Sequence, residues 1–317
     1  MPVEKKSNME KKELTAKINA LRKEKNAIIM AHYYQIPEIQ DIADFVGDSL
    51  ALAQQAEKTT AEIIVVCGVN FMGETAKILN PHKKILIPDA NAGCSLADSC
   101  PAVEFENFIK AHPNYTIVTY VNTTAAVKAL SDITVTSTNA KKIIESLPFS
   151  EKIIFGPDKN LGDYINSQTG RQMVLWDGAC HVHEQFSLEK LLKLKKQYPA
   201  AEIIAHPECK KTVLIVADFV GSTQALLNYT AKSDKKRFLV ATESGILHQM
   251  QKQSPQKEFI PVPPDDSTCA CNECNFMRMN TLEKLYNCLY TETPEILVDE
   301  KIINKAIKPI KRMLKMS

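Results

Sequence analysis

The stretch ADFVGDSLALA, residues 43–53, occurs almost unchanged a second time as ADFVGSTQALL, residues 217–227. A looser third copy, SDITVTSTNAK, lies between them at residues 131–141. The three copies carry Asp44, Asp132 and Asp218 at matching positions. Self-similarity at a regular spacing indicates an architecture built from similar supersecondary units, so the chain divides into three repeats around these copies.

Each copy follows an apolar run that is typical of a buried strand: AIIMAH at 27–32, YTIVTYVN at 115–122 and AEIIAHPE at 201–208. The middle copy contains DITVT, whose β-branched, alternating pattern favours a short strand, and the ADFVG segments are expected to end in one as well. Helical and strand patterns then alternate. Each repeat is predicted to run strand–helix–strand–helix–strand–helix–strand, which gives a small parallel sheet with helices on both faces.

The predicted fold class is therefore α/β, with three similar three-layer αβα domains in a pseudo-threefold arrangement around a central active site. The expected domains span residues 1–96, 97–181 and 182–274, and the C-terminal helices of residues 275–317 are expected to pack on the first domain. Ligands bind at the carboxyl ends of the strands in such sheets. Three repeats could therefore direct these ends toward one shared centre.

The composition is that of a globular protein and excludes several classes of function. The 317 residues are 44% hydrophobic and 24% charged, with a net charge of +2, so no global charge favours binding to nucleic acid or to a membrane surface. Neither a membrane-spanning run nor a secretion signal is recognisable in the sequence. A cytoplasmic location is expected.

Nine cysteines are many for such a protein, and in a reducing compartment some are expected to bind a metal or take part in catalysis. Cys94, Cys180 and one cysteine of the segment 269–274 each follow the last strand of a repeat. Three converging thiolates suit an iron–sulfur cluster in which one iron has no protein ligand. The alternative for each cysteine is a buried, small apolar residue.

Two other metal sites are compatible with the sequence. The motif CACNEC places Cys269, Cys271 and Cys274 close together, as in a closed zinc site, although this site leaves Cys94 and Cys180 unexplained. His181 and His183, in CHVHEQF, are alternative metal ligands.

Polar side chains recur at equivalent positions of the three repeats. His32, Tyr120 and His206 end the first strands, and Tyr34, Asn122 and Glu208 lie close after them. The two histidines, one beside a tyrosine and the other beside a glutamate, are suited to proton transfer. Ser49, Ser137 and Ser222, the last followed by Thr223, lie where helices are expected to begin. Free N–H groups at helix starts bind anions, although helix capping alone also explains such residues.

Several motifs together resemble the quinolinate synthase family, also called the quinolinate synthetase A family. They are AHYYQIPEIQDIADFVGDSLALA, CGVNFMGETAKIL, DANAGCSLAD, YVNTTAAVKALSD, FGPDKNLG, WDGACHVHEQF, AHPEC and CNFMRMNTLEKL. The resemblance covers residues 26 to 290 and is specific in the combination and order of the motifs.

The resemblance implies three α/β domains around a pseudo-threefold axis and a [4Fe-4S] cluster held by three cysteines. It implies condensation of iminoaspartate with dihydroxyacetone phosphate to quinolinate, a precursor of NAD, with loss of phosphate and water. An aspartate-oxidising enzyme would supply the iminoaspartate. Two rival functions stay open: another iron–sulfur hydro-lyase, and an iron or redox sensor without catalysis.

The resemblance also assigns roles. Cys94 and Cys180 would bind the cluster with Cys274, the cysteine that directly precedes NFMRMN, although the spacing CACNEC departs from the CxxCxxC of many members. The groups that move protons would be Tyr34, His206 and Glu208. The groups that orient the substrates would be His32, Tyr120 and Asn122, and those that anchor anionic groups would be Ser49, Ser137 and Thr223.

Overall fold

The computed structural model describes residues 2–265 and 272–317, so Cys269 and Cys271, and with them the closed zinc site, lie outside the described residues. The chain forms two compact units, Met1–Cys94 with Asn275–Ile303, and Ser95–Cys274 with Asn304–Ser317. The first unit contains one four-stranded sheet and the second contains two. All strand pairs within the sheets are parallel, which confirms the predicted α/β class.

The three sheets have the same strand order: β2-β1-β3-β4, β6-β5-β7-β8 and β10-β9-β11-β12. Each repeat also has the predicted succession of four strands and three intervening helices. In each sheet the second strand lies on one side of the first strand, and the third strand lies on the opposite side of the first strand. This reversal between the first and third strands is the position at which open α/β sheets bind ligands.

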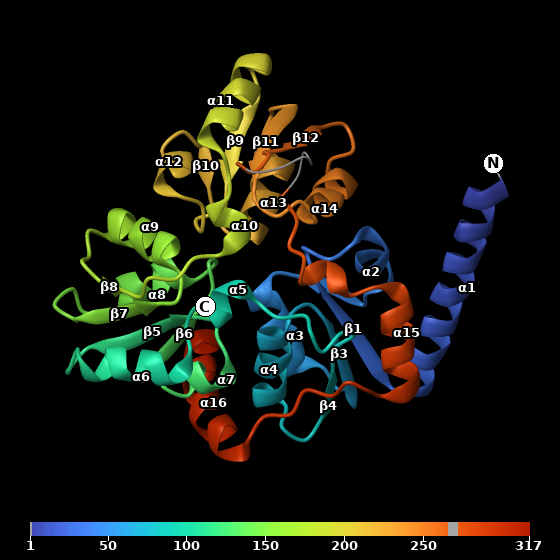
Figure 1. Ribbon diagram of the computed structural model, residues 1–317, viewed down its shortest axis with the longest axis horizontal. Helices are drawn as coiled ribbons and strands as arrows, with labels where there is room; N and C mark the ends of the chain where they lie inside the picture. The colour runs from blue at the N-terminus through green and yellow to red at the C-terminus, as the bar shows by residue number, and fades with distance from the viewer. Residues whose placement is uncertain (1, 266–271) are drawn as a thin grey trace. The chain divides into compact units, whose positions relative to one another are not determined.

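The first unit contains the first repeat and two flanking helices. Its elements are α1 (Pro2–Glu24), β1 (Ala27–His32), α2 (Pro37–Ile42), β2 (Phe45–Gly47), α3 (Ser49–Lys58), β3 (Ile63–Cys67), α4 (Asn70–Leu79), β4 (Lys84–Leu86), η1 (Met277–Met279) and α15 (Leu282–Thr291). Figure 1 shows α15 beside α1, and Leu285 of α15 joins Ile18 and Ile29 in one buried core. The strand β3 is buried at every residue, as expected for a parallel sheet covered on both faces.

The second unit contains the other two repeats. The second repeat consists of α5 (Ser95–Asp98), α6 (Ala102–Lys110), β5 (Thr116–Tyr120), α7 (Ala125–Lys128), β6 (Ile133–Val135), α8 (Ala140–Ser146), β7 (Ile153–Gly156), α9 (Lys159–Thr169), β8 (Val174–Leu175) and α10 (His181–Glu184). The third consists of α11 (Leu188–Gln197), β9 (Glu202–Ala205), α12 (Lys211–Leu214), β10 (Phe219–Val220), α13 (Thr223–Lys232), β11 (Arg237–Ala241), α14 (Ile246–Gln253) and β12 (Glu258–Pro261). Each of these sheets has its own buried apolar cluster.

The repeated aspartates fasten the second strand of each sheet to the first. Each aspartate donates its N–H to the carbonyl of a residue fifteen positions earlier, and its Oδ2 accepts the N–H of that same residue; all six distances are 2.8 to 2.9 Å. The pairs are Asp44 with Ile29, Asp132 with Ile117 and Asp218 with Ile203. These reciprocal hydrogen bonds fix the register of β2, β6 and β10 against the central strands.

A steric constraint explains why the two nearly identical copies both have a glycine, Gly47 and Gly221, after the short strand. A Cβ at Gly47 would lie 2.8 Å from the Cβ of Ala51, and one at Gly221 would lie 2.9 Å from the Cβ of Ala225. Both distances are shorter than carbon–carbon van der Waals contact. A side chain at either position would therefore push the following helix away from its strand.

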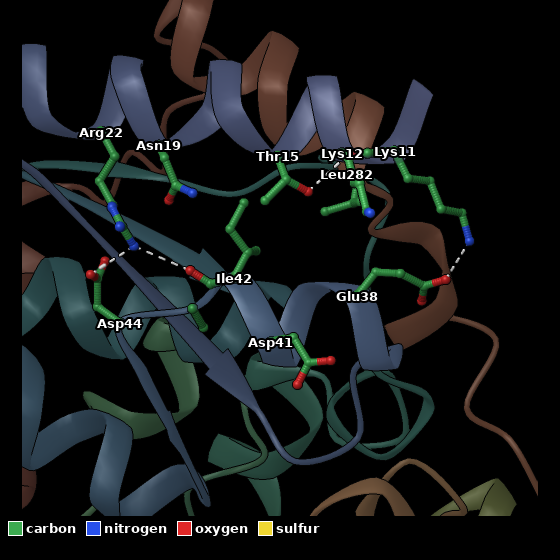
Figure 2. Close-up of a pocket in the computed structure, with 11 residues that line it drawn as sticks. Lys11, Lys12, Thr15, Asn19, Arg22, Glu38, Asp41, Ile42, Asp44 and Leu282 are labelled. Carbon is green, nitrogen blue, oxygen red and sulfur yellow. Dashed lines mark hydrogen bonds and ion pairs between the residues drawn. The ribbon is translucent and has the colours of Figure 1, made fainter. Parts of the chain in front are cut away.

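A pocket of about 620 Å³ lies between α1 and α2 in the first unit. Ion pairs connect the two sides of this pocket. Figure 2 shows Arg22 reaching from α1 to Asp44, with an Nη1 to Oδ1 distance of 2.8 Å, and donating to the carbonyl of Ile42 at 3.2 Å. Lys11 pairs with Glu38 at 2.6 Å. Because ion pairs that stay accessible to solvent contribute little, α1 is held mainly by the apolar contacts of Leu14, Ile18 and Leu21 with the core of the first unit.

The C-terminal helices divide between the two units, whereas the sequence analysis placed both on the first domain. Helix α15 packs in the first unit, but α16 (Glu300–Met316) belongs to the second unit from Asn304 onward. The hydroxyl of Thr134 in β6 donates to the carbonyl of Pro309 at 3.2 Å, and Ala306, Ile310 and Met313 of α16 are fully buried. This apolar stripe is covered in the second unit.

No helix in residues 2–265 and 272–317 is both long enough and apolar enough to cross a membrane.

Candidate active site

The candidate site residues lie at the carboxyl ends of the first strands. Strand β1 ends at His32, β5 ends at Tyr120, and His206 directly follows β9. All three side chains are buried. They therefore lie at the carboxyl ends of the first strands, as the ends of the apolar runs predict.

His32 and His206 share one local geometry. The N–H of Tyr34 donates to Nδ1 of His32 at 3.2 Å, and the N–H of Glu208 donates to Nδ1 of His206 at 3.3 Å. Because Nδ1 accepts a hydrogen bond, the neutral ring carries its proton on Nε2. In His206 this Nε2 lies 3.2 Å from Oγ of Ser137, so the imidazole can donate to the serine.

In the second unit Glu208 is the centre of a buried polar cluster. The hydroxyl of Tyr120 donates to its Oε1, and Nδ1 of His183 lies 2.9 Å from its Oε2. Burial raises the pKa of Glu208, but the positive charge that His183 and His206 carry when protonated, together with the hydrogen bonds from His183 and Tyr120, outweighs burial and lowers this pKa below the ordinary value. Glu208 is therefore ionised at neutral pH.

His183 links this cluster to Cys180. Its Nδ1 lies 3.3 Å from Sγ of Cys180, its Nε2 lies 3.0 Å from Oγ1 of Thr242, and its ring stacks on that of His206 with centroids 4.7 Å apart. From the sequence alone, His183 is predicted only as an alternative metal ligand. His183 follows Cys180 by three residues, about one helical turn. This spacing in the sequence indicates that the two side chains lie on the same side of α10.

The same geometry can hold a single metal ion. The donor atoms of Cys180, His183 and Glu208 all lie within 4.8 Å of one another, and a thiolate, an imidazole and a carboxylate are suitable zinc ligands. His181 differs, because its Nδ1 is hydrogen-bonded to Oγ of Ser95 at 2.6 Å. Burial, together with the charge of His183, lowers the pKa of His181.

Asn122 has a buried side-chain oxygen, Oδ1, without a hydrogen-bond partner among the described residues. An unsatisfied buried acceptor costs about 1–3 kcal/mol, and such groups are rare in native proteins. Asn122 follows β5 two residues after Tyr120. Its oxygen is therefore available to a donor group of a ligand.

The three anion-binding candidates have different local structures. Ser49 is the first residue of α3, where Asp48 is the capping residue, and Thr223 is the first residue of α13, where Ser222 is the capping residue. Ser137 lies in a turn three residues before α8. The position of Ser137 differs from the expected helix start because Asn139 accepts the N–H of Thr136 at 2.7 Å and closes this turn.

In the first unit Tyr34 packs against His32, with ring centroids 4.6 Å apart at 78°. Arg278 donates to the carbonyl of Tyr34 at 2.6 Å. The sequence analysis did not consider Arg278, which lies 244 residues away along the chain. Only the folded chain brings these two residues together.

The cysteines separate into two groups. Cys94, Cys180 and Cys274 are half-buried, whereas Cys67, Cys100, Cys209 and Cys288 are buried. Burial raises the pKa of all four buried thiols, to about 12 for Cys100 and Cys288 and well above the ordinary value for Cys67 and Cys209. A cysteine binds a metal as the thiolate, so among the described cysteines the three half-buried ones are the better suited to act as metal ligands.

Comparison with known proteins agrees with these motifs. The family model of the quinolinate synthetase A protein, NadA, matches residues 16–315. The chain is 60% identical over 306 residues to the quinolinate synthase of Synechocystis sp., covering 96% of each chain. It is 56% identical over 310 residues to that of Chloroherpeton thalassium, covering 98% of this chain and 96% of the relative. This chain belongs to the quinolinate synthetase A family.

Proposed function

We propose that this chain is a quinolinate synthase, which condenses iminoaspartate with dihydroxyacetone phosphate and releases phosphate and water. Relatives that carry the name quinolinate synthase match nearly its whole length at 56–60% identity. The observation that carries the catalytic proposal is the buried cluster of Tyr120, His206 and Glu208 beside the thiol of Cys180. This cluster combines proton-transfer groups with a metal ligand.

We infer that Cys94, Cys180 and Cys274 hold a [4Fe-4S] cluster with one iron free of protein ligand. The proposal is supported by their half-buried positions, because the buried cysteines have raised pKa values. When bound, such a cluster supplies a Lewis acid for a substrate hydroxyl or carboxylate. Free thiols stay reduced in a reducing compartment, so the proposal includes a cytoplasmic location.

Proton transfer is assigned to Tyr34, His206 and Glu208. Enolisation of the triose, condensation and dehydration each need a proton to be removed or delivered. His206 can pass the Nε2 proton, and it has the geometry to do so because Nδ1 accepts a backbone N–H. The ionised Glu208 accepts a hydrogen bond from the Tyr120 hydroxyl and so holds the Tyr120 side chain in place.

Substrate binding is assigned to two groups of residues. His32, Tyr120 and Asn122 orient the substrates, and the buried free oxygen of Asn122 supports this role. Anchoring of the anionic groups is assigned to Ser49, Ser137 and Thr223, of which Ser49 and Thr223 begin helices. Iminoaspartate carries two carboxylates and the triose carries one phosphate, so three anions would meet three anchoring groups.

We also propose three domains, residues 1–96, 97–181 and 182–274, whose strand ends converge on one centre by a pseudo-threefold arrangement. The common strand order of the three sheets supports this proposal. An aspartate-oxidising enzyme is the proposed source of iminoaspartate, which hydrolyses readily.

The first experiment is metal analysis of protein purified without oxygen, together with the condensation assay. About four irons with matching sulfide, lost in Cys274→Ala, would support the cluster and its third ligand. One tightly bound zinc without sulfide would instead favour a zinc site, either that of CACNEC or that of Cys180, His183 and Glu208, and would overturn the catalytic proposal.

The variant Tyr34→Phe separates the enzyme from a sensor. A synthase is expected to lose turnover in this variant and to keep its iron content. A variant that keeps full turnover would remove Tyr34 from the mechanism, and an iron-loaded wild type that binds neither substrates nor product would contradict the proposed activity.

A further inference from the structure

A repeated hydrogen bond connects the third strand of each sheet to a cysteine loop. In each repeat, the residue three positions after the third strand donates its N–H to the carbonyl two positions before a cysteine. The three bonds run from Asn70 to Ala92 at 2.7 Å, from Lys159 to Gly178 at 2.8 Å and from Ser244 to Asn272 at 3.1 Å. The cysteines are Cys94, Cys180 and Cys274, so Cys274 is the structural equivalent of the other two.

In the second unit a buried carboxylate adds a further bond to this connection. The N–H of Cys180 donates to Oδ2 of Asp158 at 3.2 Å, and the N–H of Cys274 donates to Oε1 of Glu243 at 3.2 Å. Asp158 and Glu243 both directly precede the donor residue of the repeated bond, and both are fully buried. The first repeat has Val69 at this position and therefore lacks such a carboxylate.

Each carboxylate uses its second oxygen to hold the start of a helix or turn. The N–H of Leu161 in α9 donates to Oδ1 of Asp158 at 2.8 Å, and the N–H of Gly245 donates to Oε2 of Glu243 at 2.7 Å. A carboxylate held on one side by the scaffold and on the other by a cysteine N–H restricts the backbone of that cysteine.

We propose that Asp158 and Glu243 are positioning residues for the iron–sulfur cluster, each holding the backbone of one ligating cysteine in its binding conformation. The inference rests on the proposed function, because it requires that Cys180 and Cys274 bind iron. Groups that orient metal ligands typically affect metal affinity about 10- to 100-fold when they are changed. The same range is expected here for cluster retention.

The test compares Asp158→Ser and Glu243→Gln with the wild type after anaerobic reconstitution. Serine is a good helix cap, so Asp158→Ser keeps an acceptor for Leu161 and removes the one that reaches Cys180. Glutamine keeps the size of Glu243 and replaces one carboxylate oxygen by an NH₂ group. The matched control is Asp132→Asn, because Asp132 accepts a backbone N–H as Asp158 does, but that of Ile117 in a strand and not that of a cysteine.

The readouts are the rate of iron release to a chelator and the electron paramagnetic resonance spectrum of the reduced cluster. Release is expected to be about 10- to 100-fold faster in both variants, with an altered spectrum, and unchanged in Asp132→Asn. A purely structural role would lower the unfolding temperature without altering the spectrum.

The possible failures are distinguishable. A wild type that binds no iron and sulfide would overturn the proposed function together with this inference. A loaded wild type whose two variants release iron at the wild-type rate, with the wild-type spectrum, would overturn the positioning role alone.

Discussion

At the scale of single residues, the repeated aspartates show why a short motif recurs in this chain. Asp44, Asp132 and Asp218 each form the same two hydrogen bonds to the first strand of their sheet. The aspartate is thus required by strand register in every repeat.

Replacing Asp132 by alanine should cost about 1 kcal/mol of unfolding free energy, because the N–H of Ile117 loses its side-chain acceptor. Asp132→Asn keeps an acceptor oxygen and should cost less. Chemical denaturation measures both. The surface variant Asp234→Ala serves as control, and its unfolding free energy should stay within about 0.5 kcal/mol of the wild-type value. If Asp132→Ala lost no more unfolding free energy than this control, the register role would be contradicted.

Glu208→Gln should reduce turnover about 100- to 10,000-fold while the iron content stays unchanged. The variant removes the negative charge that attracts His183 and His206 and changes the acceptor for the Tyr120 hydroxyl. The matched control is Glu202→Gln, since Glu202 also accepts a tyrosine hydroxyl, that of Tyr229, at 2.8 Å. Similar losses in the two variants would argue against a catalytic role of Glu208.

At the scale of elements, Glu292 at the end of α15 connects two other elements of the first unit. Its Oε1 lies 2.6 Å from Nζ of Lys25, which follows α1, and its Oε2 pairs with Lys84 at the start of β4. The hydrogen bonds to Lys25 and Lys84 lower the pKa of Glu292 to about 2. A carboxyl whose pKa falls on folding stabilises the folded state in its ionised form.

The stability that Glu292 contributes should therefore be present above about pH 4.5, the ordinary pKa of glutamate, and decrease as the pH falls toward 2. Unfolding of the wild type and Glu292→Gln by denaturant, followed from pH 7 to pH 3, measures this difference. The two curves should converge toward acid pH. Glu57→Gln on α3 is the control, and a difference between wild type and Glu292→Gln that does not change with pH would contradict the ion-pair explanation.

At the scale of the whole molecule, the proposed ligands come from widely separated parts of the chain. Cys94 ends one stretch of the first unit, and Cys180 and Cys274 belong to the second. A cluster that binds all three would bind the folded chain and not the unfolded one. Its binding free energy would then add to stability by mass action.

Cluster loading should raise the unfolding temperature by about 5–10 °C, the shift expected for a ligand present at a hundred times its Kd. Cys94→Ala, Cys180→Ala and Cys274→Ala should each remove this shift. Cys288→Ala should keep it, because Cys288 is a buried thiol whose pKa is raised to about 12. Anaerobic differential scanning calorimetry, with and without chelator, measures the shift in unfolding temperature. A shift that is lost in Cys288→Ala but kept in the three other variants would contradict the assignment of ligands.

The sequence by itself determined the α/β class, the three repeats and the order of strands and helices within each. These features follow from local periodicity and from the matching spacing of Asp44, Asp132 and Asp218, which are properties of short segments. The same reasoning placed His32, Tyr120 and His206 at strand ends, because the end of an apolar run is visible in the sequence.

Only the tertiary structure decided which of these residues meet. The contacts of Glu208 with Tyr120 and His183, and that of Arg278 with Tyr34, join residues that are distant in the chain. The distribution of α15 and α16 between the two units also depends on which apolar face each helix finds. Such contacts arise from packing of whole elements, and no local pattern of residues specifies them.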